Sequence, residues 1–364
     1  MFKISNRFFI LVVIVLLLIL AGAYFFYQAG DSNHVPQDDL VEENSPTDNL
    51  TDLPISPVSP LSPVMVPNSP LPIPPNSTFD VEEIFAKIDQ AELAYKEGNY
   101  DEALRIIDEV MAVDPNNPFA YNTRGNTYTA LNRYNEAMTD YSRAIALDPE
   151  LSFLYYNRGR LHNLLENYDD AISDLQKSVE LSPVEFGYRA YGAIGLIYHN
   201  LSQYDKALEA FETSISYNRD ERADIYYYRG ETHTALNDYD AAIDDYQAAL
   251  SRFSRYDEAY QGLGYAYYKT AQYDQALEAL NEALEISPNS AIAHFYLGLV
   301  YLAMDQFDDA EAAFAQATDS ISTLSEEEQE FISSRVLTDL ETFAQENPDQ
   351  ADEVDALINL IPEP

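Results

Sequence analysis

One glycine returns at a nearly constant interval along most of this chain, and that interval limits the folds open to it. Successive glycines are 34, 36, 35, 34 and 34 residues apart, and a ring and an alanine follow each by 9 and 12 residues. Such a period is typical of arrays in which each unit is one supersecondary element stacked on the next. The columns are Gly125, Gly159, Gly195, Gly230, Gly264 and Gly298; Tyr100, Tyr134, Tyr168, Tyr204, Tyr239, Tyr273 and Phe307; and Ala103, Ala137, Ala171, Ala207, Ala242, Ala276 and Ala310.

Within each period the pattern predicts two helices joined by a turn. Tyr121 and Tyr128 stand four and three residues from Gly125, so the three share one helix face. Glycine costs about 1 kcal/mol inside a helix relative to alanine, and its recurrence therefore predicts a close approach of two helices. On the second helix, Ala137 is expected to nest against the first helix, and the ring of Tyr141 to fill a pocket of the next unit.

The pattern resembles the tetratricopeptide repeat family, whose unit is a 34-residue helix-turn-helix. The resemblance implies an all-α fold, a right-handed superhelical solenoid. Departures exist: the family's tryptophan position holds tyrosine in most units, and the first unit has Ala91 in place of glycine. Insertions around the fourth unit predict longer turns near 186–187 and 222. The seven predicted units, which together span 84–324, are 84–117, 118–151, 152–185, 188–221, 223–256, 257–290 and 291–324.

After the last unit, residues 325–364 are expected to form capping helices, because a terminal repeat has a bare apolar face. Ser325 and Glu328 have the spacing of a capping box. An apolar stripe follows them, and a last short helix is predicted over 349–360. The stripe consists of Ile332, Val336, Leu340 and Phe343.

At the other end, residues 8–27 form an uncharged apolar run. Twenty helical residues span about 30 Å, the thickness of a bilayer's hydrocarbon core. Basic residues precede the run and acidic ones follow it, which predicts a cytoplasmic segment 1–7, a transmembrane helix 8–27 and an extracytoplasmic repeat domain in a single-pass membrane protein. A cleaved signal peptide is the alternative. Residues 28–80 are rich in proline, serine and acid and predict a disordered linker.

The composition excludes several kinds of chemistry. The chain has 62 acidic and 20 basic residues, a formal net charge of −42, and no cysteine. That charge repels nucleic acid and favours basic or neutral partners. No two of the five histidines share a helix at metal-ligand spacing, and no phosphate loop or nucleophile motif is present. We expect no enzyme activity, no catalytic residues, no cofactor and no metal site.

The resemblance implies a protein or peptide ligand held in a concave groove lined by the first helices. The inward positions of those helices carry rings and amides, which suit peptide recognition. Self-association in a structural or assembly role is the alternative. Arg124, Arg158 and Arg229 flank the groove, either as partners of neighbouring acids or as a row of basic contacts. The predicted groove residues are Phe119, Asn122, Asn126, Phe153, Tyr156, Arg160, Asn163, Arg189, His199, Tyr227, Tyr265, Tyr268 and Phe295.

Overall fold

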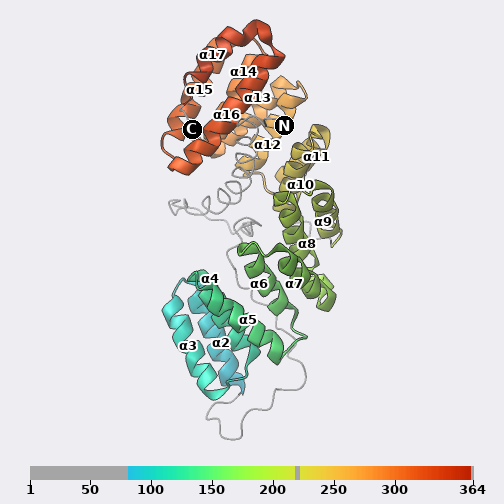
Figure 1. Ribbon diagram of the computed structural model, residues 1–364, viewed down its shortest axis with the longest axis vertical. Coiled ribbons are helices and arrows are strands. Elements are labelled where there is room, and N and C mark those ends of the chain that lie inside the picture. Colours follow the sequence, from blue (N-terminus) through green and yellow to red (C-terminus); the bar gives the residue numbers. More distant parts are fainter. Residues whose placement is uncertain (1–80, 218–221, 362–364) are drawn as a thin grey trace, which may run out of the picture. The chain divides into compact units, whose positions relative to one another are not determined.

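The computed structural model describes residues 81–217 and 222–361, which form helices joined by short turns. The predicted membrane segment 8–27 and linker 28–80 lie outside these residues. Within the described ranges, no helix combines the length and the apolar character needed to cross a bilayer. The helices in Figure 1 are α2 (Val81–Lys96), α3 (Tyr100–Val113), α4 (Pro118–Ala130), α5 (Tyr134–Leu147), α6 (Ser152–Leu164), α7 (Tyr168–Leu181), α8 (Pro183–Asn200), α9 (Tyr204–Ser216), α10 (Ala223–Ala235), α11 (Tyr239–Arg252), α12 (Asp257–Lys269), α13 (Tyr273–Ile286), α14 (Ala291–Ala303), α15 (Phe307–Ile321), α16 (Glu326–Glu346), a 3₁₀ turn Pro348–Gln350 and α17 (Ala351–Ile358).

The described chain divides into two compact bodies. The first body contains residues 81–197 and 209–217, and the second contains 198–208 and 222–361. Each body is built from hairpins in which an even-numbered first helix, from α2 to α14, is followed by an odd-numbered second helix. The glycine column therefore lies on first helices, and the alanine column lies on second helices.

The close approach predicted at the glycines is confirmed. A Cβ atom at Gly125 would lie 2.8 Å from Cε1 of Tyr141, and one at Gly195 would lie 2.6 Å from Cδ1 of Phe211. Both rings are fully buried. The second-helix ring thus packs against the glycine of its own unit, rather than only in the next unit's pocket. Tyr246 does both, since a Cβ at Gly262 of the following first helix would lie 2.5 Å from its Cζ.

The turn inside each hairpin has one recurring geometry. After α4, the amide of Asn132 donates to the carbonyl of Thr129, and the amide of Arg133 donates to the carbonyl of Tyr128. This double bond pattern is the Schellman motif, which needs a left-handed residue after the helix. The left-handed residues are Gly98, Asn132, Glu166, Ser202, Asn237, Ala271 and Asp305, with φ between 55° and 75°.

The predicted longer turn near 186–187 is wrong. The helix α7 ends at Leu181 and α8 begins at Pro183, so the inserted residues lengthen α8 to 18 residues instead of lengthening the turn. Proline suits the first position of a helix, because its missing N–H would have no intrahelical partner there. The added turn brings Gly187 against Tyr217, whose Cε1 would lie 2.4 Å from a Cβ at that glycine.

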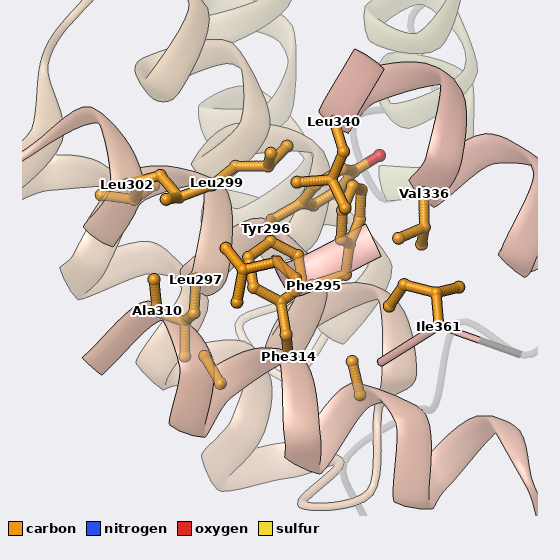
Figure 2. Packing of buried hydrophobic residues seen from close by; sticks show 14 of the residues in the cluster. Phe295, Tyr296, Leu297, Leu299, Leu302, Ala310, Phe314, Val336, Leu340 and Ile361 are labelled. Carbon is orange, nitrogen blue, oxygen red and sulfur yellow. The ribbon is translucent and has the colours of Figure 1, made fainter. Parts of the chain in front are cut away.

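The second body ends in an apolar core that joins α14, α15 and α16. Figure 2 shows Phe295 and Tyr296 of α14 and Phe314 of α15 at its centre, with Val336 and Leu340 of α16 pointing toward them. Burial of these groups removes apolar area from water at about 25 cal/mol per Å². The stripe of α16 therefore covers the last repeat, and all four of its residues are buried: Ile332, Val336, Leu340 and Phe343.

Candidate functional site

In the first body, the predicted groove begins with a ladder of three phenyl rings. Phe85, Phe119 and Phe153 occupy one position on α2, α4 and α6, with successive ring centroids 5.6 and 5.7 Å apart. The rings of Phe85 and Phe119 are partly exposed, whereas Phe153 is 8% exposed. The sequence argument did not name Phe85, although it lies one 34-residue period before Phe119.

The two asparagines predicted for this part of the groove are used inside the fold. The side-chain oxygen of Asn122 accepts a hydrogen bond from Asn157 Nδ2 at 2.9 Å. That of Asn126 accepts one from the hydroxyl of Tyr141 at 2.7 Å. Both asparagines are buried, at 6% and 2% exposure. Because a buried polar group needs a partner, these bonds hold neighbouring helices in register.

Further along the first body, two predicted residues are buried and two are accessible. Tyr156 is buried and packs 5.1 Å from the ring of Phe186. The guanidinium of Arg160 lies 5.7 Å from the Tyr156 ring and is also buried. Asn163 and Arg189 are partly exposed. Together with Phe119, they are the predicted groove residues that solvent reaches in this body.

In the second body, Tyr227 and Phe295 belong to the core. Tyr227 packs 5.0 Å from Tyr256 and 6.0 Å from Tyr246, and burial followed by the charge of Glu231 raises its pKa well above the ordinary value. Phe295 is 1% exposed and lies 5.7 Å from Phe314. Neither ring is available to a partner without repacking.

The accessible predicted residues of the second body are His199, Tyr265 and Tyr268, which are all partly exposed. Tyr265 lies 4.7 Å from Tyr296 and 6.2 Å from Tyr268. Tyr239, which begins α11, stands edge-on to Tyr265 at 6.2 Å. The sequence argument treated Tyr239 only as a repeat ring. Its nearness to Tyr265 depends on how adjacent hairpins pack, which no single helix face reveals.

His199 is the one predicted groove residue with a resolved shift in its proton equilibrium. Its Nδ1 lies 2.9 Å from the hydroxyl oxygen of Thr232, and its ring stands edge-on to Tyr204 at 5.6 Å. Burial lowers its pKa from 6.5 to about 4, because the charged form loses its hydration. The side chain is therefore neutral at pH 7.

The arginines that flank the groove are paired with acids of their own units. Arg124 Nε and Nη2 donate to the carboxylate of Asp140 at 2.7 and 2.9 Å. Arg158 binds Asp174 in the same bidentate way, and Arg229 binds Asp245. Each aspartate is buried, and each arginine side chain is 21–23% exposed. Of the two readings of these arginines, the structure supports pairing with a neighbouring acid.

Within the described ranges, no group of three or more histidine, aspartate or glutamate residues has the geometry of a metal site. What the first helices offer is surface for contact: rings, amides and arginines held on rigid helices. Rings of this kind supply contact area at little cost in conformational entropy.

Comparison with known proteins identifies the repeat. Family models described as TPR repeat or tetratricopeptide repeat match residues 125–165 and 272–305, 193–258, and 154–185. The small glutamine-rich tetratricopeptide repeat-containing protein 2 of Saccharomyces cerevisiae is 30% identical over 91 residues, 25% of this chain and 24% of that protein. Anaphase-promoting complex subunit cut9 of Schizosaccharomyces pombe is 32% identical over 78 residues, 21% of this chain and 12% of that protein. The chain therefore spans a quarter or less of these relatives.

Solved structures show the same fold. The crystal structure of the APC/C hetero-tetramer Cut9–Hcn1 superposes with a TM-score of 0.52 at 20% identity, covering 71% of this chain and 49% of that one. The C-terminal part of a TPR repeat-containing protein from Cytophaga hutchinsonii gives 0.54 at 19% identity, covering 66% and 97%. At these identities the likeness concerns the fold alone. The helical hairpins of this chain are tetratricopeptide repeats, and the chain belongs to that family.

Proposed function

We propose that this protein is a membrane-tethered scaffold that binds a protein or peptide segment along the first helices of its repeats, outside the cytoplasm. Proteins built from tetratricopeptide repeats act as interaction or assembly scaffolds. The observation that carries the proposal here is the set of rings that stay partly exposed on first helices, while equivalent rings are buried. Those rings are Phe85, Phe119, Tyr265 and Tyr268.

The burial pattern narrows the contact surface. Of the residues proposed from the sequence, Asn122, Asn126, Tyr156, Tyr227 and Phe295 hold the array together. The surface proposed for a partner consists of Phe119, Asn163 and Arg189 in the first body, and His199, Tyr265 and Tyr268 in the second. Partly exposed aromatic residues with a buried edge are typical anchors at protein interfaces.

The proposed tether is the uncharged run 8–27, and the proposed spacer is 28–80. A high-salt wash of membranes tests the tether, because a helix inserted in the bilayer resists salt whereas a peripheral contact does not. Release of the chain into the soluble fraction would contradict it. An enzyme fused after Pro364 that works only in an oxidising compartment tests the side of the membrane, and activity in the cytoplasm would contradict export.

Site-specific photocrosslinking tests the binding surface. A photoreactive phenylalanine analogue is placed at Phe119, Tyr265 or Tyr268, and at the exposed positions Glu209 and Glu212 of α9 as controls. We expect adducts with a partner from the three ring positions and not from the controls. Adducts only between copies of this chain would favour the structural alternative, and adducts only from α9 would contradict the proposed surface.

A further inference from the structure

Charge is divided unevenly along the chain. Residues 270–364 hold 21 acidic residues and a single basic one, Arg335, although the whole chain has 20 basic residues. The second body therefore ends in a surface whose own sequence supplies almost no counter-charge. A partner that covers part of this surface has to compensate carboxylates that lose water, because an unpaired carboxylate is costly to desolvate.

A cluster of three tyrosines lies next to these carboxylates, and we call it the tyrosine cluster. It consists of Tyr239 of α11 and of Tyr265 and Tyr268 of α12, with Tyr265 at the centre, 6.2 Å from each of the other two rings. All three rings are partly exposed. Tyr265 and Tyr268 also pack on the apolar core of the second body, so their positions are fixed from beneath.

The helix α16 brings acidic groups to this cluster. Its Leu340 is buried in the core on which Tyr265 and Tyr268 pack, and Figure 2 shows Leu340 pointing toward α14. Burial raises the pKa of Tyr268, and the negative charges of Asp339 and Glu346 raise it further. Those carboxylates are therefore close enough to act on the ring hydroxyl.

The protein already places cations against tyrosine rings. The guanidinium of Arg124 lies 5.4 Å from the ring of Tyr121, and that of Arg252 lies 3.9 Å from the ring of Tyr226. At the tyrosine cluster, Nζ of the exposed Lys269 lies 6.0 Å from the Tyr239 ring and 5.9 Å from the Tyr268 ring. A cation above a ring face is attracted by the ring's negative quadrupole.

We propose that the tyrosine cluster, with Asp339 and Glu346, binds an arginine or lysine side chain of a positively charged partner segment. The rings supply the faces and the carboxylates supply the charge, while the core beneath keeps both in place. This inference rests on the proposed function and specifies the partner that its second body accepts. An acidic segment or a nucleic acid is excluded from this surface by the same carboxylates.

Two short peptides of equal length test the proposal: acetyl-(Ala-Arg)₄-amide and acetyl-(Ala-Gln)₄-amide, each with the same fluorescent label. Each is titrated against the full chain in a neutral detergent at low and at physiological salt, and binding is followed by fluorescence anisotropy. We expect the arginine peptide to bind at least tenfold more tightly than the glutamine peptide, with an advantage that shrinks as salt rises. Equal binding of the two peptides overturns the proposal.

Matched variants separate the site from the general negative field. Glu346→Lys changes one exposed acid beside the cluster, and Glu285→Lys makes the same change at an exposed position of α13. We expect Glu346→Lys to weaken binding of the arginine peptide at least fivefold and Glu285→Lys to weaken it less than twofold. Tyr268→Leu, which removes a ring and no charge, should also weaken it severalfold. Equal losses from the two lysine variants would mean that only net charge matters, and the proposal would be wrong.

The two proposals fail in different ways. A photocrosslinked partner segment without basic side chains at Tyr265, together with no preference for the arginine peptide, removes this inference and leaves the scaffold function standing. Site-dependent binding of the arginine peptide without any partner adduct from the ring positions leaves the cation site standing and removes the proposed function.

Discussion

Arg158 of α6 and Asp174 of α7 form a bidentate ion pair, with Nε and Nη2 of the arginine at 2.7 and 2.8 Å from the two carboxylate oxygens. The residues are 16 positions apart, and the same offset joins Arg124 to Asp140 and Arg229 to Asp245. Three other units have an aliphatic residue and an alanine at these positions, all buried: Ile194 with Ala210, Leu263 with Ala279, and Leu297 with Ala313. The repeat thus accepts either a charged or an apolar pair between its two helices.

The ion pair predicts an asymmetric response to mutation. Arg158→Leu leaves the carboxylate of Asp174, which is 9% exposed, without its guanidinium partner, and we expect a loss of about 3 kcal/mol in the free energy of unfolding. Asp174→Ala leaves an arginine that is 23% exposed and can turn toward water, at a cost of about 1 kcal/mol. The double variant reproduces the pair Leu263 and Ala279 and should lie within about 1 kcal/mol of the unmutated chain. Chemical denaturation followed by circular dichroism measures all three.

Additive losses in the double variant would contradict this account. They would show that the aliphatic pair is tolerated only within its own units, and that the ion pair has no apolar equivalent in α6 and α7.

The glycine column predicts that two similar substitutions differ. At Gly195 a new Cβ would lie 2.6 Å from the buried ring of Phe211, so Gly195→Ala should cost about 1–3 kcal/mol by overpacking. At Gly159 the nearest atom is 3.1 Å away, on the side chain of Asp174, and a small shift accommodates the methyl group. The gain of about 1 kcal/mol in helix propensity then offsets that strain, and Gly159→Ala should be nearly neutral. Thermal melting of both variants decides, and equal losses would contradict the difference in spacing.

The left-handed turn residues predict a stabilising change. Ala271 has φ of 57°, a conformation that costs an L-residue about 1–2 kcal/mol and glycine nothing. We therefore expect Ala271→Gly to raise the free energy of unfolding by up to about 1 kcal/mol. Ala248→Gly, within α11, is the control and should lower it by about 1 kcal/mol. A loss at both positions would mean that the turn gains nothing from glycine.

The sequence predicted the helical hairpins, the close approach at the glycines and the apolar stripe of α16, because each depends on spacing along one helix or on a repeated column. It did not predict the fate of Asn122 and Asn126. Their partners, Asn157 and Tyr141, lie 35 and 15 residues away, on other helices. Whether an inward side chain faces solvent or a neighbouring helix depends on such pairings, and helix periodicity carries no information about them.

The same limit applied to α8. The extra residues before 188 were assigned to a turn, since proline commonly follows a helix. Pro183 instead starts the next helix, and Gly187 meets Tyr217 across the hairpin. That contact can be found only when both helices are placed. The residue types in the insertion agree with either outcome.

The pH dependence of stability provides the last prediction, through His199. Burial lowers the pKa of its ring to about 4 in the folded chain, against 6.5 in an unfolded one. Between these values the unfolded chain binds a proton that the folded chain does not. Stability from this group is therefore complete above pH 6.5 and is lost as the pH falls toward 4, by at most about 1.4 kcal/mol per pH unit. In His199→Gln that loss is absent, so its unfolding free energy should fall less steeply than that of the unmutated chain between pH 7 and 5, with a difference on the order of 1–2 kcal/mol at pH 5. Urea denaturation at pH 7, 6 and 5 measures both slopes over a range in which most carboxylates stay ionised. Parallel slopes would show that the ring accepts a proton in the folded chain, and that the contact between Nδ1 and Thr232 does not keep it neutral.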